Sequence, residues 1–352
     1  MKKLIRMLLV LVATSFFVPA LAVEGESIVF NPMTGNYLIT YQDSSDGVFE
    51  QITFVPSTKI NPLLKSKLKL VQDAVIHYGY ALTSGQDSQQ EIEAFRLDPV
   101  SSVTTNTSDI PLNAPPGQIA VDMLNAAGYF ETPTPWRARM AYSRDGKAFR
   151  ISWSYKVDGG LPPGKQAVFG FDSHDLPSII QVQVTGYAPN SQEIPGEILQ
   201  DAHDGAFGQQ YTELVSKKNF VPRNTAVPTI PVPTPFDAAV LLDRIQTQMH
   251  TWIGMQLLDA TFSSQLDRYF QSAISAYRLN QPKVGKKHIQ TMRELIKKEQ
   301  PDADREDVQD DRDEKGDNND NNKRILIDKL AARILDFDLK YVMKRMGGDK
   351  GD

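Results

Sequence analysis

Two stretches of the form Asp-x-His-Asp carry the residue types that hydrolytic metal sites use. They are Asp172-Ser173-His174-Asp175 and Asp201-Ala202-His203-Asp204. If the fold brings them together, two imidazoles and four carboxylates would bind a divalent cation and activate water. The catalytic candidates of such a metal-dependent hydrolase are His174, His203, Asp175 and Asp204. The alternative is that both stretches form turns, because Asp and Ser beside Pro or Gly are common turn residues.

A second set of candidate ligands lies in segment 302–322, which has ten acidic and three basic residues. Asp oxygens are hard ligands that suit Ca²⁺, the one cofactor that the sequence suggests, although 317–320 lacks the spacing of an EF-hand loop. The candidate ligands are Asp302, Asp304, Asp307, Asp310, Asp311, Asp313, Asp317 and Asp320. The competing interpretation is a disordered acidic loop over 301–323, because the segment has too few apolar residues to order itself.

Aromatic residues in the first half suggest a third kind of site. Trp153 and Tyr155 are two residues apart in a predicted strand, and Trp136 lies in another. Exposed on one face, they would form a platform for a sugar; buried, they would be core residues. His77, between Ile76 and Tyr78, is expected to be a hydrogen-bonded sheet histidine.

The composition narrows the function classes. The chain has no cysteine, which excludes thiol nucleophiles, Fe-S clusters and cysteine zinc sites. Lys2, Lys3 and Arg6 precede an apolar run and a small-x-small site at residues 20–22, which predicts a signal peptide over 1–22. Removing these three cations changes the formal charge from -5 to -8, so a nucleic-acid partner is not expected. No later run is long enough for a membrane span.

The elements that would position these residues fall into two groups. Short alternating runs separated by turns predict an antiparallel β-sandwich over 23–190. Its strands are expected at 27–30, 37–41, 51–55, 68–82, 91–97, 136–142, 149–155, 167–171 and 179–185.

The segment 191–235 is expected to be partly helical and then a proline-rich spacer. Prolines at 222, 228, 231, 233 and 235 favour a semi-rigid polyproline II segment. The alternative is that Val227, Ile230 and Val232 pack along the sandwich as part of its surface.

Apolar residues recur at helical spacing over 236–346 and predict a small α-helical bundle of four helices, followed by a tail at 347–352. The start signals are Thr234-Pro235-Phe236-Asp237, with Thr234 as N-cap, then Asp259 and Pro282. The fold class is therefore multidomain α+β.

Three stretches of this region, 266–280, 283–296 and 324–342, follow one another in a recognisable order: a Leu-x-x-x-(Tyr/Phe) helix ending in Ala-Tyr, a helix of the Ala/Gly-x-x-His/Gln-Ile type, and a third apolar helix. This order resembles the FIMAH-type helical module of exported bacterial proteins. The acidic insertion before the last helix departs from that pattern. The resemblance implies an extracellular interaction or spacer module and brings no catalytic residue. Segment 153–177 also looks like a pattern of exported bacterial β-sandwich proteins.

An export signal without a catalytic motif favours a secreted, non-enzymatic binding protein, periplasmic or extracellular. Its partner would be an extracellular or envelope protein or a glycan. The alternatives are the metal-dependent hydrolase and a structural surface or matrix component.

Overall fold

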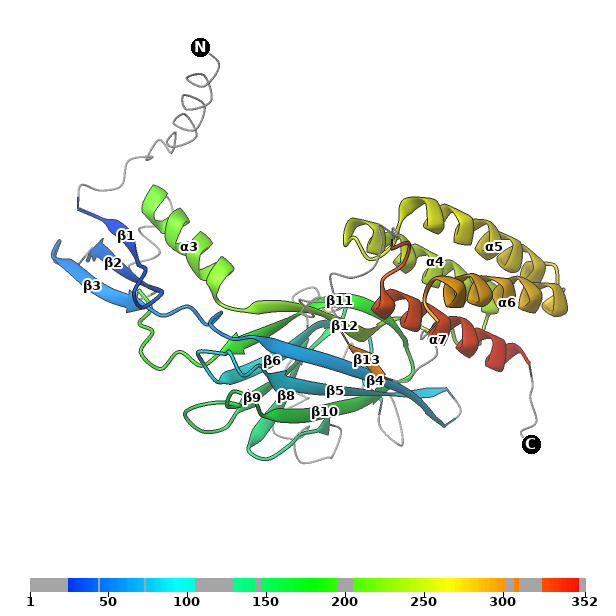
Figure 1. Ribbon diagram of the computed structural model, residues 1–352, viewed down its shortest axis with the longest axis horizontal. Helices are drawn as coiled ribbons and strands as arrows, with labels where there is room; N and C mark the ends of the chain where they lie inside the picture. Colours follow the sequence, from blue (N-terminus) through cyan, green and yellow to red (C-terminus); the bar gives the residue numbers. More distant parts are fainter. Residues whose placement is uncertain are drawn as a thin grey trace, which may run out of the picture. The chain divides into compact units, whose positions relative to one another are not determined.

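The computed structural model describes residues 25–43, 45–72, 74–104, 130–142, 147–194, 196, 205–301, 307–309 and 325–347. Within these ranges the chain is mixed α+β, with three antiparallel sheets and five helices, most of which follow the strands in the sequence (Figure 1). The predicted signal peptide lies outside the described residues.

Contacts divide the chain into two units that do not follow the predicted order of domains. The small unit comprises 1–56 and 188–219, and the large unit comprises 57–187 and 220–352. The first three strands therefore belong with a helix about 150 residues further along, and the remaining strands share a unit with the C-terminal helices. Alternation within a strand predicts its buried face but not which distant segment covers that face.

The small unit is a three-stranded sheet with one helix. Its elements are β1 (Ser27–Asn31), β2 (Asn36–Gln42), β3 (Phe49–Phe54) and α3 (Ala206–Lys218). The three strands pair in sequence order. Ile39 and Tyr41 on β2 share a core with Phe207 and Tyr211 of α3. One face of the sheet is thus covered by a single helix.

The large unit contains two five-stranded sheets, ordered β13-β4-β5-β10-β7 and β12-β11-β6-β9-β8. The strands are β4 (Pro62–Gln72), β5 (Val75–Ser84), β6 (Ile92–Val100), β7 (Phe130–Glu131), β8 (Trp136–Tyr142), β9 (Phe149–Tyr155), β10 (Gln166–Ser173), β11 (Leu176–Gly186), β12 (Val221–Ile230) and β13 (Asp307–Gln309). On β5, buried residues alternate with partly exposed ones, so one face of the strand packs inward.

Aromatic side chains from both sheets form the centre of the core. The Tyr80 ring of β5 lies 5.6 Å from that of Phe95 on β6 and 6.3 Å from that of Trp153 on β9, measured between ring centroids. Phe169 of β10 lies 5.3 Å from Trp153. The Tyr80 hydroxyl donates a hydrogen bond to the Ala226 carbonyl at 2.9 Å, so its polar end is satisfied as well.

The predicted spacer is wrong over 221–230, because this segment is the strand β12 and pairs with β11 along its length. β12 is an edge strand, where Pro222 and Pro228 remove no ladder hydrogen bond that the sheet needs. Val227 and Ile230 are buried, which confirms the alternative that they pack along the sheets. The helical part expected in 191–235 is found as α3.

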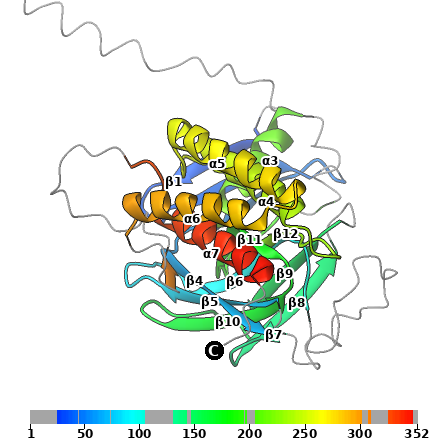
Figure 2. The ribbon, with the colours of Figure 1, turned by 90° about the vertical axis from the view of Figure 1, so that its right-hand side faces the viewer.

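The C-terminal helices are α4 (Ala238–Gly254), α5 (Ala260–Arg278), α6 (Pro282–Glu299) and α7 (Lys329–Met346). α4, α5 and α6 pack in sequence order, and α7 contacts α4, α6 and the strands β11, β12 and β13. Figure 2 shows α7, in red, between the other helices and the strands. Helices and sheets share one core cluster, so the helices do not stand apart as a separate domain.

The helix start signals are mostly confirmed. The Asp259 carboxylate accepts hydrogen bonds from the backbone N–H of Thr261 and Phe262, and Pro282 is the first residue of α6. The first signal is displaced: the N-cap of α4 is Asp237, which accepts from the Val240 N–H, and not Thr234. The predicted strand 68–82 is also wrong, because β4 and β5 form a hairpin there, with Ala74 at a φ of 89°.

Candidate functional site

The first Asp-x-His-Asp stretch forms the turn between β10 and β11. The Ser173 hydroxyl accepts a hydrogen bond from the Asp175 N–H at 3.1 Å. The buried Asp175 carboxylate accepts from the Ser101 hydroxyl at 2.6 Å and from the Val232 N–H at 3.1 Å. These contacts hold neighbouring segments together, as expected of a turn, and engage both oxygens of Asp175 within the protein.

Asp172, the first residue of that stretch, pairs with His77 across two strands. Its Oδ1 lies 2.8 Å from His77 Nδ1, which confirms the hydrogen-bonded sheet histidine. Glu131 of β7 lies 3.8 Å from the other ring nitrogen. The Asp172 hydrogen bond raises the pKa of His77, partial burial opposes it, and Glu131 adds to it. Gly170 leaves room for this group, since a Cβ there would lie 3.0 Å from both His77 Cε1 and Glu131 Oε2.

Among the described residues, the contacts of His77 are with two carboxylates. A triad requires a hydroxyl or thiol at the free nitrogen of the histidine. In the described part of the chain, that nitrogen faces the Glu131 carboxylate. The arrangement therefore forms a cross-strand charge group that links β5, β10 and β7.

The other predicted ligands are mostly outside the described residues. This holds for His203 and Asp204, and for the acidic candidates Asp302, Asp304, Asp310, Asp311, Asp313, Asp317 and Asp320. The backbone of Asp307 pairs with Lys67 in the ladder of β13 and β4. Among the residues described, no three His, Asp or Glu side chains are grouped to hold a metal ion.

Two residues of the predicted sugar platform belong to the core instead. Trp153 and Trp136 are buried, and Trp136 packs edge-on against Phe169 with 5.0 Å between ring centroids. Tyr155 packs edge-on against Trp136 at 5.4 Å. Strand periodicity places Trp153 and Tyr155 on one face but does not say whether that face is wet, and here a second sheet covers Trp153.

A surface that the sequence analysis missed lies on the small unit, on the sheet face opposite α3. Val29 of β1 and Leu38 of β2 are directly paired and are 54% and 40% exposed. Because side chains alternate along a strand, they point away from their buried neighbour Ile39. Phe49 on β3 has the same orientation, and Met33 at the β1–β2 turn is 92% exposed. We call Val29, Met33, Leu38 and Phe49 the apolar face.

The segment that carries the apolar face has charges of one sign. Residues 25–56 contain four carboxylates and no lysine or arginine. They are Glu26, Asp43, Asp46 and Glu50. Hydrogen bonds from the Ser45 side chain and backbone lower the pKa of Asp43, so this acid stays ionised. The sequence did hold the signals: an unbroken apolar run, Ile28-Val29-Phe30, in a strand that should alternate, and a long segment without cations.

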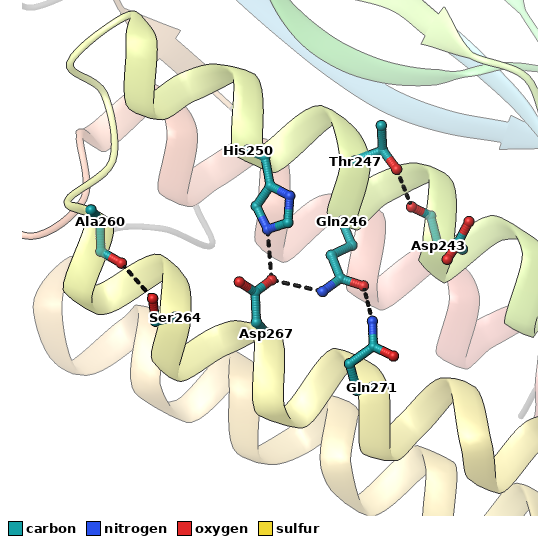
Figure 3. A network of polar contacts seen from close by, with 8 residues as sticks. All are labelled: Asp243, Gln246, Thr247, His250, Ala260, Ser264, Asp267 and Gln271. Atoms are coloured by element: carbon teal, nitrogen blue, oxygen red, sulfur yellow. Dashed lines mark hydrogen bonds and ion pairs between the residues drawn. The ribbon is translucent and has the colours of Figure 1, made fainter.

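The helices carry a polar network of their own, between α4 and α5 (Figure 3). Asp267 Oδ1 lies 2.7 Å from both His250 Nε2 and the Gln246 side-chain amide nitrogen. Gln271 donates to the Gln246 carbonyl oxygen at 2.7 Å. Since Gln246 is buried and hydrogen-bonded at both its amide nitrogen and its carbonyl oxygen, the network fixes the register of the two helices.

No protein-family model matches the sequence, and no curated protein or solved structure is significantly similar to it. The FIMAH-type resemblance therefore stays a prediction. Within the described ranges, none of the helices has the length and apolar character needed to cross a membrane.

Proposed function

We propose that this chain is an exported, non-enzymatic binding protein that docks another protein on the apolar face of its small unit. The observation that carries the proposal is the concentration of exposed apolar side chains there. Of the large hydrophobic residues that are exposed in the described chain, four make up the apolar face, and two more, Phe30 and Val48, lie in the same segment of the chain. Contiguous exposed apolar residues on a folded protein commonly mark an interaction site.

Covering this face favours binding, and the gain is a fraction of that of full burial because Val29, Leu38 and Phe49 are already about half covered. Full burial of a Val, Leu, Phe or Met side chain is worth about 1.5–3 kcal/mol each. Val29 and Leu38 are adjacent across two strands, so a partner that covers one also covers the other. Part of the gain is offset by the loss of translational and rotational freedom on association.

The charge of the small unit selects the class of partner. With four carboxylates and no cation over residues 25–56, the sheet repels nucleic acid and anionic membrane surfaces. A protein surface with an apolar centre and basic residues at its edge complements it. A glycan partner fits less well, because the exposed ring here is Phe49 and no tryptophan is near it in the strand register.

The large unit supports this role as a scaffold. In the proposal its two sheets form a β-sandwich and its four helices a bundle of the FIMAH type, which supplies a second interaction or spacer module. Export rests on the N-terminal cations, apolar run and cleavage pattern of residues 1–22.

The test is capture of partners by the mature protein from an envelope extract, compared with a double variant, Val29→Asp and Leu38→Asp. The matched control is Val157→Asp, an equally exposed valine of the large unit. We expect the double variant to lose a specific partner that the control keeps. Added salt should weaken the capture of that partner by the wild-type protein. Circular dichroism must show both variants folded.

Other outcomes assign other functions. Capture unchanged in the double variant would contradict the proposal. Self-association in light scattering, abolished by the same variant, would identify a structural component. Turnover of any substrate, lost on changing one polar residue, would identify an enzyme.

A further inference from the structure

Helix α7 carries two fully buried aspartates, two residues apart, with opposite surroundings. Asp336 Oδ1 accepts a hydrogen bond from Arg293 Nε at 2.7 Å, and its Oδ2 lies 2.9 Å from Lys340 Nζ. Asp338 is likewise 0% exposed, yet neither of its carboxylate oxygens has a hydrogen-bond partner among the described residues.

The groups that face Asp338 offer it no compensating charge. Tyr78 of β5 is close enough to feel its charge, but the Tyr78 hydroxyl donates to the Asp175 carbonyl at 2.7 Å. Tyr341 lies one turn along α7, and Arg345 lies beside Tyr341, with its guanidinium 5.8 Å from that ring. From α6, Arg293 is engaged by Asp336.

On the other elements packed on α7, the side chains that the structure describes add no cation that pairs with Asp338. On α4 the ionisable residues are Asp243, Arg244 and His250, of which Arg244 donates to the Pro231 carbonyl and His250 bonds Asp267. On β12 the ionisable residue is Arg223, whose guanidinium donates a hydrogen bond to the Pro62 carbonyl at 2.7 Å. None of these groups pairs with Asp338.

An ionised carboxylate without a partner is strongly disfavoured in a protein interior, whereas the neutral acid is tolerated far better. Burial accordingly raises the pKa of Asp338 well above its ordinary value. The same helix thus holds one aspartate that needs its charge and one that must lose it.

We propose that α7 packs against the sheets with Asp338 in its neutral, protonated form, so that the docking of this helix is linked to one proton. α7 lies between the other helices and the strands (Figure 2), so the proton stabilises the seam of the large unit. The inference concerns the large unit alone and does not rest on the proposed partner of the small unit.

The direction of the pH effect follows from linkage. In the unfolded chain Asp338 has the ordinary aspartate pKa of 3.8, and in the folded protein its pKa is higher. The folded state therefore binds the proton more tightly, and its stability is full below the unfolded value. Stability falls as pH rises through the folded pKa. Asp338→Asn keeps the shape and removes the titration.

The experiment measures the melting temperature of the mature protein from pH 4 to pH 9 at constant salt. We expect the wild type to lose several degrees as pH rises, and Asp338→Asn to lose less and to exceed the wild type at the alkaline end. Asp336→Asn is the matched control, because it should melt lower than the wild type. The fold also raises the pKa of His77 and, by burial, that of Glu93, so His77→Gln and Glu93→Gln separate the contributions of these two groups.

If a variant fails to fold, an NMR titration of the wild type still tests whether Asp338 is protonated. NMR titration of the aspartate side-chain carbons in the wild type should show one carboxyl that stays protonated far above pH 4. Equal pH slopes in the wild type and Asp338→Asn, or ordinary titration of every aspartate, would overturn the proposal. So would a rise in melting temperature with Na⁺, Ca²⁺ or Zn²⁺ that requires Asp338, since a bound cation would then replace the proton.

Discussion

The outer face of the large unit's first sheet is charged, with Lys65, Lys67 and Lys69 on β4 and His77 on β5, whereas the sheet of the small unit presents Val29 and Leu38. Both sheets are antiparallel with one buried face. The same architecture thus leaves one sheet with a solvated outer surface and the other with a surface that gains by being covered. The difference lies in the residues at alternate positions, and it is the reason for proposing that the small unit binds a partner.

The interiors differ as well. In the large unit the aromatic side chains of two sheets pack on each other, and the helices extend the same core. The small unit has one helix and a core of seven fully buried apolar residues, Ile39, Tyr41, Ile52, Phe54, Ile194, Phe207 and Tyr211. A core this small leaves little reserve of stability, so a partner that covers the outer face would also stabilise the unit.

The largest effect is expected from Trp153→Ala in the core of the large unit. Trp153 is 0% exposed and packs on Phe95, Phe169 and Tyr80, so its removal leaves a cavity and should cost about 3–5 kcal/mol. Denaturant unfolding followed by far-UV circular dichroism would measure it. If the two units fold independently, the signals of β1–β3 and α3 in NMR should persist where those of the large unit are lost. Loss of both together would show that the units are one cooperative body.

A smaller effect is expected where the helices join the large unit. Arg293→Met removes one of the two cations that neutralise the buried Asp336 and should cost about 3 kcal/mol, because breaking a buried pair leaves a charge partly uncompensated. Lys340 remains and limits the loss. The control is Lys298→Met, an exposed lysine of the same helix, and thermal melting should place the control at the wild-type value. Equal melting of Arg293→Met and the wild type would mean that the buried pair contributes nothing.

The two faces of the small unit can be compared on adjacent residues. Ile39→Ala opens the core under α3 and should cost about 2 kcal/mol or more. Leu38→Ala, on the apolar face, should change stability by less than about 1 kcal/mol. Partner capture should show the reverse order, with the loss in Leu38→Ala. Hydrogen exchange of the β2 amides would measure the stability of this unit directly, and equal effects of both changes would remove the distinction between its faces.

Periodicity and capping chemistry were sufficient to predict the helices and most strands. Asp259, Pro282 and the alternation of 179–185 act locally, and the structure has the elements where these signals place them. The hairpin at Ala74 was missed because the left-handed turn residue is not glycine. The pairing of β12 with β11 joins residues 37 to 54 positions apart, which no local pattern encodes.

The position of the candidate residues in the fold was not predictable. The Asp-x-His-Asp pattern suggested a shared metal site, whereas Asp172 is hydrogen-bonded to His77, 95 residues away on a neighbouring strand. Trp153 was recognised as a residue with two interpretations, and only the presence of a second sheet decides for the core. The apolar face escaped notice because exposure depends on what covers a strand.

The smallest effect concerns the charged outer face, where His77 is held by two carboxylates of unequal importance. Asp172 is hydrogen-bonded to the ring, and Glu131 acts through space from 3.8 Å with a largely exposed side chain. Asp172→Asn should therefore lower the pKa of His77 clearly, and Glu131→Gln should lower it less, since solvent screens the exposed acid. An NMR titration of the His77 ring protons in each variant would measure both shifts.

That titration also carries a prediction for stability. The fold raises the pKa of His77 above its ordinary value of 6.5. Its contribution to the stability of the folded protein is therefore full below pH 6.5 and is lost as pH rises through the folded pKa. A larger shift from Glu131→Gln than from Asp172→Asn would mean that the solvent-facing pair, and not the cross-strand hydrogen bond, holds the charge. In that case the exposed side chains would determine the properties of the outer face in both sheets. The two sheets would then differ only in whether those exposed side chains are charged or apolar.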